Sequence, residues 1–236
     1  MSHERNDGGS NVYYRFHHYK IDLILFFVLF VVLSFIFVGL VGGAFKEIGF
    51  AWDVAMLILL GSLFGSWINI PVAKVATTRE TVTQQYVEYF GIIFRVPTRV
   101  QAKTPTTVAI NVGGALIPII VSTYLFLKIP LLIQHALIPI ILVSVIMYVV
   151  ARPIKGIGIA APALVAPLAA AGLAILLAQP YAPYAAYVSG VLGTLIGADI
   201  AHLKDVFKSG PRIASIGGAG TFDGIFLSGI LAAILA

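Results

Sequence analysis

The closing stretch of the chain, SIGGAGTFDGIFLSGILAAILA (Ser215–Ala236), consists mostly of glycine, alanine and bulky apolar residues around one carboxylate, Asp223. A helix crosses the roughly 30 Å hydrocarbon core of a bilayer with about 20 mostly apolar residues, and this stretch is long enough. A carboxylate at membrane depth is costly, so one that occurs there usually faces a polar interior or takes part in function. The stretch therefore predicts a membrane helix that carries a functional or buried polar residue.

The composition of the whole chain agrees with a membrane protein. Of its 236 residues, 59% are hydrophobic and 11% are charged, whereas soluble domains carry about 25% charged residues. The absence of cysteine excludes disulfides, thiol nucleophiles and thiolate metal sites. The net charge of +5 is not gathered in a dense basic run. We therefore expect basic loops next to a lipid bilayer and no nucleic-acid partner.

The apolar stretches predict an all-α integral membrane protein of about seven transmembrane helices. The expected spans are residues 21–43, 52–74, 107–127, 129–150, 157–179, 182–203 and 216–236. Of the 15 lysines and arginines, only Lys46 and Lys128 fall on one side of these spans, and all others fall on the opposite side. Because basic loops stay in the cytoplasm, we expect a multi-pass cell-membrane protein with its N-terminus inside and its C-terminus outside.

Two segments lie outside the expected spans. Residues 1–20 are predicted to form a disordered cytoplasmic tail before a single transmembrane domain, residues 21–236. Residues 75–106 are predicted to form a cytoplasmic loop. Within it, β-branched and aromatic residues surround Gly91 over residues 82–99, which favours a short β-hairpin. An amphipathic segment on the membrane surface is the alternative.

Two pairs of similar sequence blocks within the chain favour an internal duplication. The block LLGSLFGSWINI (Leu59–Ile70) resembles VLGTLIGADIAH (Val191–His202), and NVGGAL (Asn111–Leu116) resembles SIGGAG (Ser215–Gly220). The two pairs occur in the same order, so we favour a parallel repeat of three spans, a linker span and three spans. The alternative is chance similarity between glycine-rich membrane helices, whose small residues permit close packing.

Several polar residues are expected at a similar depth near the cytoplasmic face. At 1.5 Å per residue, Asp199 lies roughly 6 Å and Asp223 roughly 10 Å inside their spans, so the two carboxylates are expected to face each other. The helix dipole favours ionised Asp223 near a helix N-terminus and protonated Asp199 near a C-terminus. No cofactor or metal is expected. The candidate binding residues are Asn69, Asn111, Pro162, Asp199, His202 and Asp223.

Five blocks of the chain resemble a prokaryotic membrane family known only as a domain of unknown function. They are INIPV (residues 68–72), INVGGALIPI (110–119), ARPIKGIGIAAPALVAP (151–167), GADIAHL (197–203) and IGGAGTFDGIFLSGILA (216–232). The resemblance covers most of residues 60–236 and implies a shared fold without an established activity.

A second resemblance is to intramembrane aspartyl proteases of the presenilin and signal-peptide-peptidase type. Those enzymes pair two membrane aspartates with a Pro-Ala-Leu motif, and Asp199, Asp223 and Pro162-Ala163-Leu164 are similar in kind. Neither aspartate lies in a Gly-x-Gly-Asp motif, and Pro-Ala-Leu precedes both aspartates instead of following them. These departures put proteolysis in doubt.

Three functions follow as hypotheses. The first is a small permease or ion-coupled transporter that binds a small solute or ion beside the carboxylates. The second is an intramembrane aspartyl hydrolase, in which Asp199 and Asp223 would be the catalytic acid and base acting on a helical membrane substrate. The third is a non-catalytic membrane scaffold whose carboxylates hydrogen-bond between helices. Whether the chain is an enzyme, and its oligomeric state, stay open at this point.

Overall fold

A computed structural model describes residues 11–89, 92–154, 158–208, 211–218 and 224–236. The chain divides into two compact units, Met1–Gly42 and Gly43–Ala236. Helix α1 (Asn11–Glu47) begins in the first unit and ends in the second. An unbroken apolar run free of proline explains its length, and from Ile21 onwards it is long and apolar enough to cross a membrane. Over residues 23–40, all of its leucines and all of its phenylalanines except Phe37 are exposed, as a lipid-facing helix requires.

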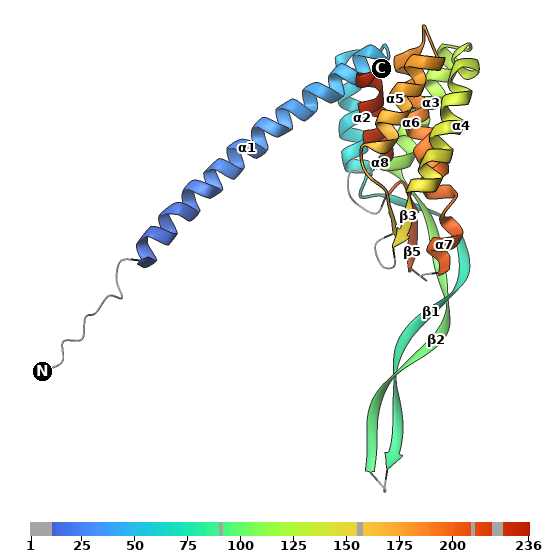
Figure 1. The fold of residues 1–236 in the computed structure, drawn as a ribbon. Coiled ribbons are helices and arrows are strands. Elements are labelled where there is room, and N and C mark those ends of the chain that lie inside the picture. The colour runs from blue at the N-terminus through green and yellow to red at the C-terminus, as the bar shows by residue number, and fades with distance from the viewer. Residues whose placement is uncertain (1–10, 90–91, 155–157, 209–210, 219–223) are drawn as a thin grey trace, which may run out of the picture. The chain divides into compact units, whose positions relative to one another are not determined.

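The second unit is a bundle of apolar helices with a long β-hairpin (Figure 1). Its helices are α2 (Trp52–Gly65), α3 (Ile117–Lys128), α4 (Leu132–Val150), α5 (Val165–Leu177), α6 (Ala182–Thr194), α7 (Leu203–Lys208) and α8 (Gly224–Leu235). Two π-helical segments adjoin them, η1 (Val112–Leu116) before α3 and η2 (Leu195–Ile200) after α6. These π-helical segments place irregular backbone at the ends of two helices.

Helix α6 forms the centre of the bundle. It packs against α4, α5 and α8, and most of its residues are buried. Small residues permit this packing: a Cβ on Gly190 would lie 2.8 Å from the carbonyl oxygen of Ser228, and one on Gly229 would lie 2.6 Å from Val191. Close backbone approach at small residues is how helices associate where lipid removes the hydrophobic driving force.

The strands form two sheets in the described chain. Strand β1 (Asn69–Tyr89) pairs antiparallel with β2 (Ile92–Asn111), and the end of β2 pairs parallel with β5 (Ile213–Ile216), from Thr107↔Ile213 to Ile110↔Ile216. Strands β3 (Arg152–Ile154) and β4 (Gly158–Ala160) form a separate antiparallel pair. Beyond β5, strands β1 and β2 continue as a twisted two-stranded ribbon that extends past the helices of this unit (Figure 1).

The expected all-α fold of about seven transmembrane helices is wrong. Of the described helices, three are long and apolar enough to cross a membrane: Ile21–Glu47, Leu132–Val150 and Ala182–Lys208. The other apolar helices have only 10–17 residues. Residues 69–89 and 92–111 are strands, so the end of the second expected span (52–74) and the start of the third (107–127) are not helical. Mean hydropathy depends on the side chains and not on the backbone hydrogen-bond partners. The apolar ends of β1 and β2 were therefore predicted as parts of membrane helices.

The hairpin is confirmed, but it is much longer than expected. Strand pairing runs from Asn69↔Asn111 to Tyr89↔Ile92, whereas the sequence predicted a hairpin only over residues 82–99. The added strand residues are rich in β-branched Val, Thr and Ile, which have high β-propensity and explain the extension.

The expected repeat of three spans, a linker span and three spans is wrong as well, because it requires seven membrane spans and three described helices are long enough to be spans. Its two blocks also have different neighbours. A Cβ on Gly65 would contact Gly113 of η1, whereas one on Gly197 would clash with Ser144 and Met147 of α4.

Candidate functional site: the polar junction at the base of the hairpin

The base of the hairpin is held by an asparagine pair at its open end. Asn69 and Asn111 lie opposite each other in the strand register. The amide of Asn111 donates to the side-chain oxygen of Asn69 at 3.2 Å and to the carbonyl of Ser66 at 2.6 Å. Its own side-chain oxygen accepts from the backbone N–H of Gly114 at 2.8 Å. Buried Asn111 therefore ties the hairpin to the end of α2 and to the start of η1.

Strand β5 joins the same junction from the other end of the sequence. The hydroxyl of Ser215 donates to the side-chain oxygen of Asn69 at 2.6 Å, so this oxygen accepts from both Ser215 and Asn111. A hydrogen bond between buried polar groups contributes about 1 kcal/mol net, and one left unmade costs more. We call the set Ser66, Asn69, Asn111, Asp199, Ser215 and Gly217 the polar junction.

Asp199 closes the junction on the side of η2. Its carboxylate accepts the backbone N–H of Gly217, which directly follows β5, at 2.7 Å. Gly217 has a φ of +84°, and a Cβ there would lie 2.5 Å from that of Ala115 in η1. Only glycine fits such a position without strain. The carboxylate therefore fixes the end of β5 where this strand packs on η1.

His202 lies one turn after Asp199 and faces its own helix. Its Nδ1 lies 3.0 Å from the carbonyl oxygen of Ala198 and 3.2 Å from that of Gly197. Because a carbonyl oxygen only accepts, Nδ1 carries the proton and donates. The buried ring stacks on Tyr148 of α4, with ring centroids 5.1 Å apart. These contacts give His202 a packing role between η2 and α4.

A second clasp lies one step further along the hairpin. The hydroxyl of Thr106 donates to the carbonyl of Pro211 at 2.6 Å, and so the hydroxyl of Thr77, 2.7 Å away, donates to Thr106. The backbone N–H of Thr107 donates to the carbonyl of Arg212 at 3.0 Å. The base of the ribbon is thus bonded to the segment before β5 through both side chains and backbone.

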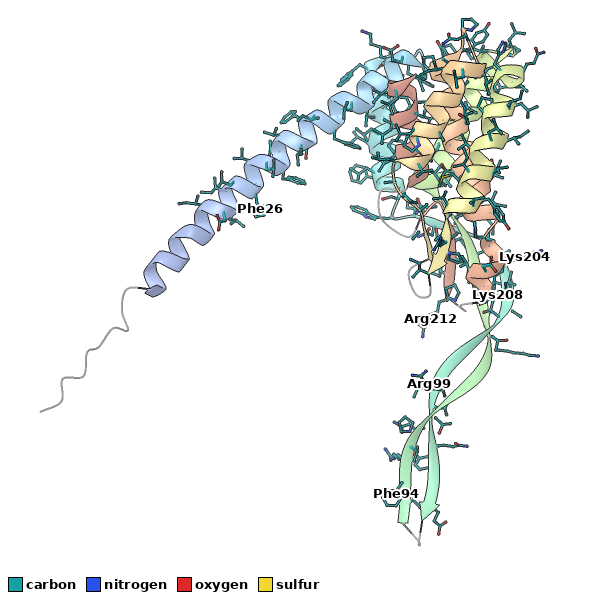
Figure 2. The ribbon with its side chains drawn as sticks, viewed as in Figure 1. Phe26, Phe94, Arg99, Lys204, Lys208 and Arg212 are labelled. Atoms are coloured by element: carbon teal, nitrogen blue, oxygen red, sulfur yellow. The ribbon has the colours of Figure 1, made fainter. Side chains whose placement is uncertain are left out.

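Basic residues surround this base and continue along the hairpin (Figure 2). Lys204 and Lys208 come from α7, Arg212 precedes β5, and Arg99 lies on β2. Lys208 forms an ion pair with Asp205 at 2.5 Å. Asp205 offsets one of the three cations Lys204, Lys208 and Arg212, and so these segments keep a positive charge.

The structure brings together some of the predicted site residues but not others. Asn69 and Asn111 are hydrogen-bonded, Asp199 joins them through β5, and His202 follows Asp199 on the same segment. Pro162 instead lies in the exposed connection between β4 and α5, where its carbonyl accepts the N–H of Val165 at 3.2 Å. Asp223 lies outside the described residues, so its pairing with Asp199 stays a prediction.

Sequence reasoning missed Ser215, Tyr148 and the carbonyl of Ser66. Ser215 did carry a signal, because it occupies the position of Asn111 when SIGGAG is aligned with NVGGAL. Nothing in the sequence marks Tyr148, whose contact with His202 depends on how α4 packs against η2.

The chain belongs to the family described as Protein of unknown function (DUF1614), which it matches over residues 63–235. The matched region includes the whole hairpin and the polar junction. No curated protein and no solved structure matches the chain. The resemblance noted in the sequence is therefore confirmed as family membership.

Proposed function

We propose that this DUF1614 protein is a multi-pass plasma-membrane scaffold that holds the β1–β2 ribbon in the cytoplasm as a docking arm. The observation that carries the proposal is the ribbon itself, with strands of 21 and 20 residues clamped at their base by β5 and the polar junction. At about 3.3 Å per residue, each strand extends roughly 65–70 Å.

The ribbon does not suit the hydrocarbon core of a bilayer. Past Thr107, no described strand pairs with the outer edges of β1 and β2, so both edges leave backbone N–H and C=O groups open. In lipid each unsatisfied group costs several kcal/mol, and only helices and closed barrels avoid this cost. A ribbon with open edges therefore belongs in water. Its lysines and arginines support the cytoplasmic side, since basic segments are retained there.

The polar groups in the helical part support a structural role for that part. Asn69, Asn111, Asp199 and Ser215 bind one another or nearby backbone, and these bonds join β1, β2 and β5 to one another, to the end of α2 and to η2. This is the arrangement that the scaffold hypothesis requires: polar groups that hold segments together. The helices then serve as the anchor, and the function lies in what the arm contacts.

The test uses the absence of native cysteine. Thr83→Cys places a thiol on an exposed position of β1. We expect a membrane-impermeant maleimide to label it in inverted membrane vesicles but not in intact cells. A photo-reactive amino acid at Val82 should then give a discrete crosslinked partner in cells, whereas the same group at exposed Leu142 of α4 should crosslink only lipid. Labelling of Thr83→Cys in intact cells, or identical crosslinks from both positions, would contradict the proposal.

One observation favours a second candidate function, an ion-coupled permease. Asp199 is a half-buried carboxylate in a π-helical segment, and irregular helices often occur at binding sites in transporters. In liposomes, Asp199→Asn should then abolish proton or solute movement, while the equally conservative Asp205→Asn in α7 should not. If both variants and the wild-type chain are equally silent, the permease is excluded and the scaffold retained.

A further inference from the structure

We propose that one face of the ribbon binds an acidic, extended segment of a partner protein; this inference rests on the docking role proposed above. The face is defined by the strand register. Tyr86 lies opposite Arg95, Val82 opposite Arg99, and Thr78 opposite Lys103. Because alternate residues of a strand share a face, these six residues form a single stripe, which we call the basic stripe.

The cations of the basic stripe recur regularly. Arg95, Arg99 and Lys103 are exposed and lie four residues apart on β2, which spaces them about 13 Å from one another. No described carboxylate forms an ion pair with them. Glu88 lies on the same face, near the tip. The two strands together carry five basic and two acidic residues, so the ribbon is positive as a whole.

Apolar and aromatic side chains lie between these charges. Val82, Tyr86 and Ile93 are 66%, 63% and 65% exposed, and the guanidinium of Arg95 lies 5.6 Å from the centroid of the Tyr86 ring. A two-stranded ribbon alone in water is only marginally stable. A partner that covers these side chains would remove apolar surface from water and so stabilise the ribbon. An extended peptide also presents alternate side chains to one face, at the same period as the ribbon.

Other occupants fit the stripe less well. A second copy of the ribbon would oppose like charges, which is unfavourable. Arg95 lies sixteen residues from the base at Asn111, about 50 Å along β2, far beyond the roughly 8 Å screening length at physiological salt. An anionic lipid surface at the base would therefore not attract Arg95. Nucleic acid presents a phosphate about every 3.4 Å along a strand, so cations spaced about 13 Å apart would neutralise few phosphates.

The experiment measures peptide binding to the full chain in nanodiscs of neutral phosphatidylcholine. The probe is a fluorescent peptide of repeated Glu-Thr-Val-Thr, in which glutamate recurs at every fourth position, and fluorescence anisotropy reports its binding. The control probes are the same peptide with lysine in place of glutamate, an oligothymidylate and vesicles that contain phosphatidylserine. We expect the acidic peptide to bind, more weakly as salt is raised, and the lysine peptide not to bind.

Variants assign the binding to the stripe. Arg95→Gln combined with Arg99→Gln should weaken binding about tenfold, because one exposed ion pair contributes up to about fivefold. Arg95→Lys with Arg99→Lys should stay within about threefold of wild type. The matched control is Arg152→Gln with Lys46→Gln, two exposed basic residues outside the ribbon, which should leave binding unchanged.

Any of the following binding results would overturn the inference. Equal binding of the lysine peptide, an unchanged affinity in the double glutamine variant, or preferential binding of oligothymidylate or of the anionic vesicles would exclude the acidic protein segment. Self-association of the nanodisc-bound chain that competes with the peptide would assign the face to a second copy instead. Maleimide labelling of Thr83→Cys separates the two proposals. If the ribbon is cytoplasmic but the peptide does not bind, only this inference fails; if the ribbon is not cytoplasmic, the docking function fails as well.

Discussion

The contact between α2 and η1 predicts a strong effect of one added methyl group. A Cβ on Gly113 would lie within 3.0 Å of the backbone of Ser62, Ser66 and Gly65, and none of these backbone atoms can rotate away. Gly113→Ala must therefore push the end of α2 away from η1. The same shift would weaken the hydrogen bond from the Ser62 hydroxyl to the carbonyl of Gly113, 2.5 Å long in the native chain.

The expected magnitude follows from opposing terms. Overpacking costs about 1–3 kcal/mol, and the weakened hydrogen bond adds about 1 kcal/mol. The helix propensity of alanine over glycine returns at most about 1 kcal/mol. We therefore expect Gly113→Ala to lower the free energy of unfolding by about 2 kcal/mol, because the steric cost exceeds the propensity gain.

The measurement is reversible unfolding of the purified chain in mixed micelles. Gly172→Ala in α5 is the matched control, since a Cβ at Gly172 meets nothing within 4 Å. It should be neutral or should stabilise by up to about 1 kcal/mol. If Gly113→Ala is as stable as the wild-type chain, or if both variants lose the same stability, the close contact between α2 and η1 is refuted.

Two further predictions concern the junction and the ribbon. Asn111→Ala removes bonds to Ser66, Asn69 and Gly114 and should cost about 2–4 kcal/mol in the same assay, whereas Thr123→Ala on the exposed surface of α3 should change stability by less than about 0.5 kcal/mol. If Asn111→Ala and Thr123→Ala lower the free energy of unfolding equally, the hydrogen bonds of Asn111 do not stabilise the polar junction. Spin labels on Thr83→Cys and Thr98→Cys, directly opposed in the register, should couple at short range, since the Cβ atoms of such a pair lie about 4.5–5.5 Å apart. If the spin label at position 83 couples more strongly to a label at a position next to 98 on β2 than to one at 98, the strand register is shifted.

The sequence by itself determined the membrane character of the chain, the presence of a hairpin and the family. Apolar runs too long for a soluble core, such as the one in α1, identify a membrane protein from composition alone. The β-branched and aromatic residues on both sides of Gly91 predict strands, because the β pattern is local. The blocks from INIPV to IGGAGTFDGIFLSGILA were specific enough to identify the family. Each of these signals lies within a short window, where side-chain chemistry is sufficient.

The tertiary structure alone decided how far the strands extend and which polar groups meet. Residues 70–72 and 108–110 are as apolar as the helices around them, and they are extended at the hairpin base because β1, β2 and β5 supply one another's backbone partners. Ser215 bonds Asn69 across 146 positions of sequence, a contact that no local pattern encodes. Apolar side chains are compatible with either a strand or a helix, and it is the distant hydrogen-bond partner that selects between them.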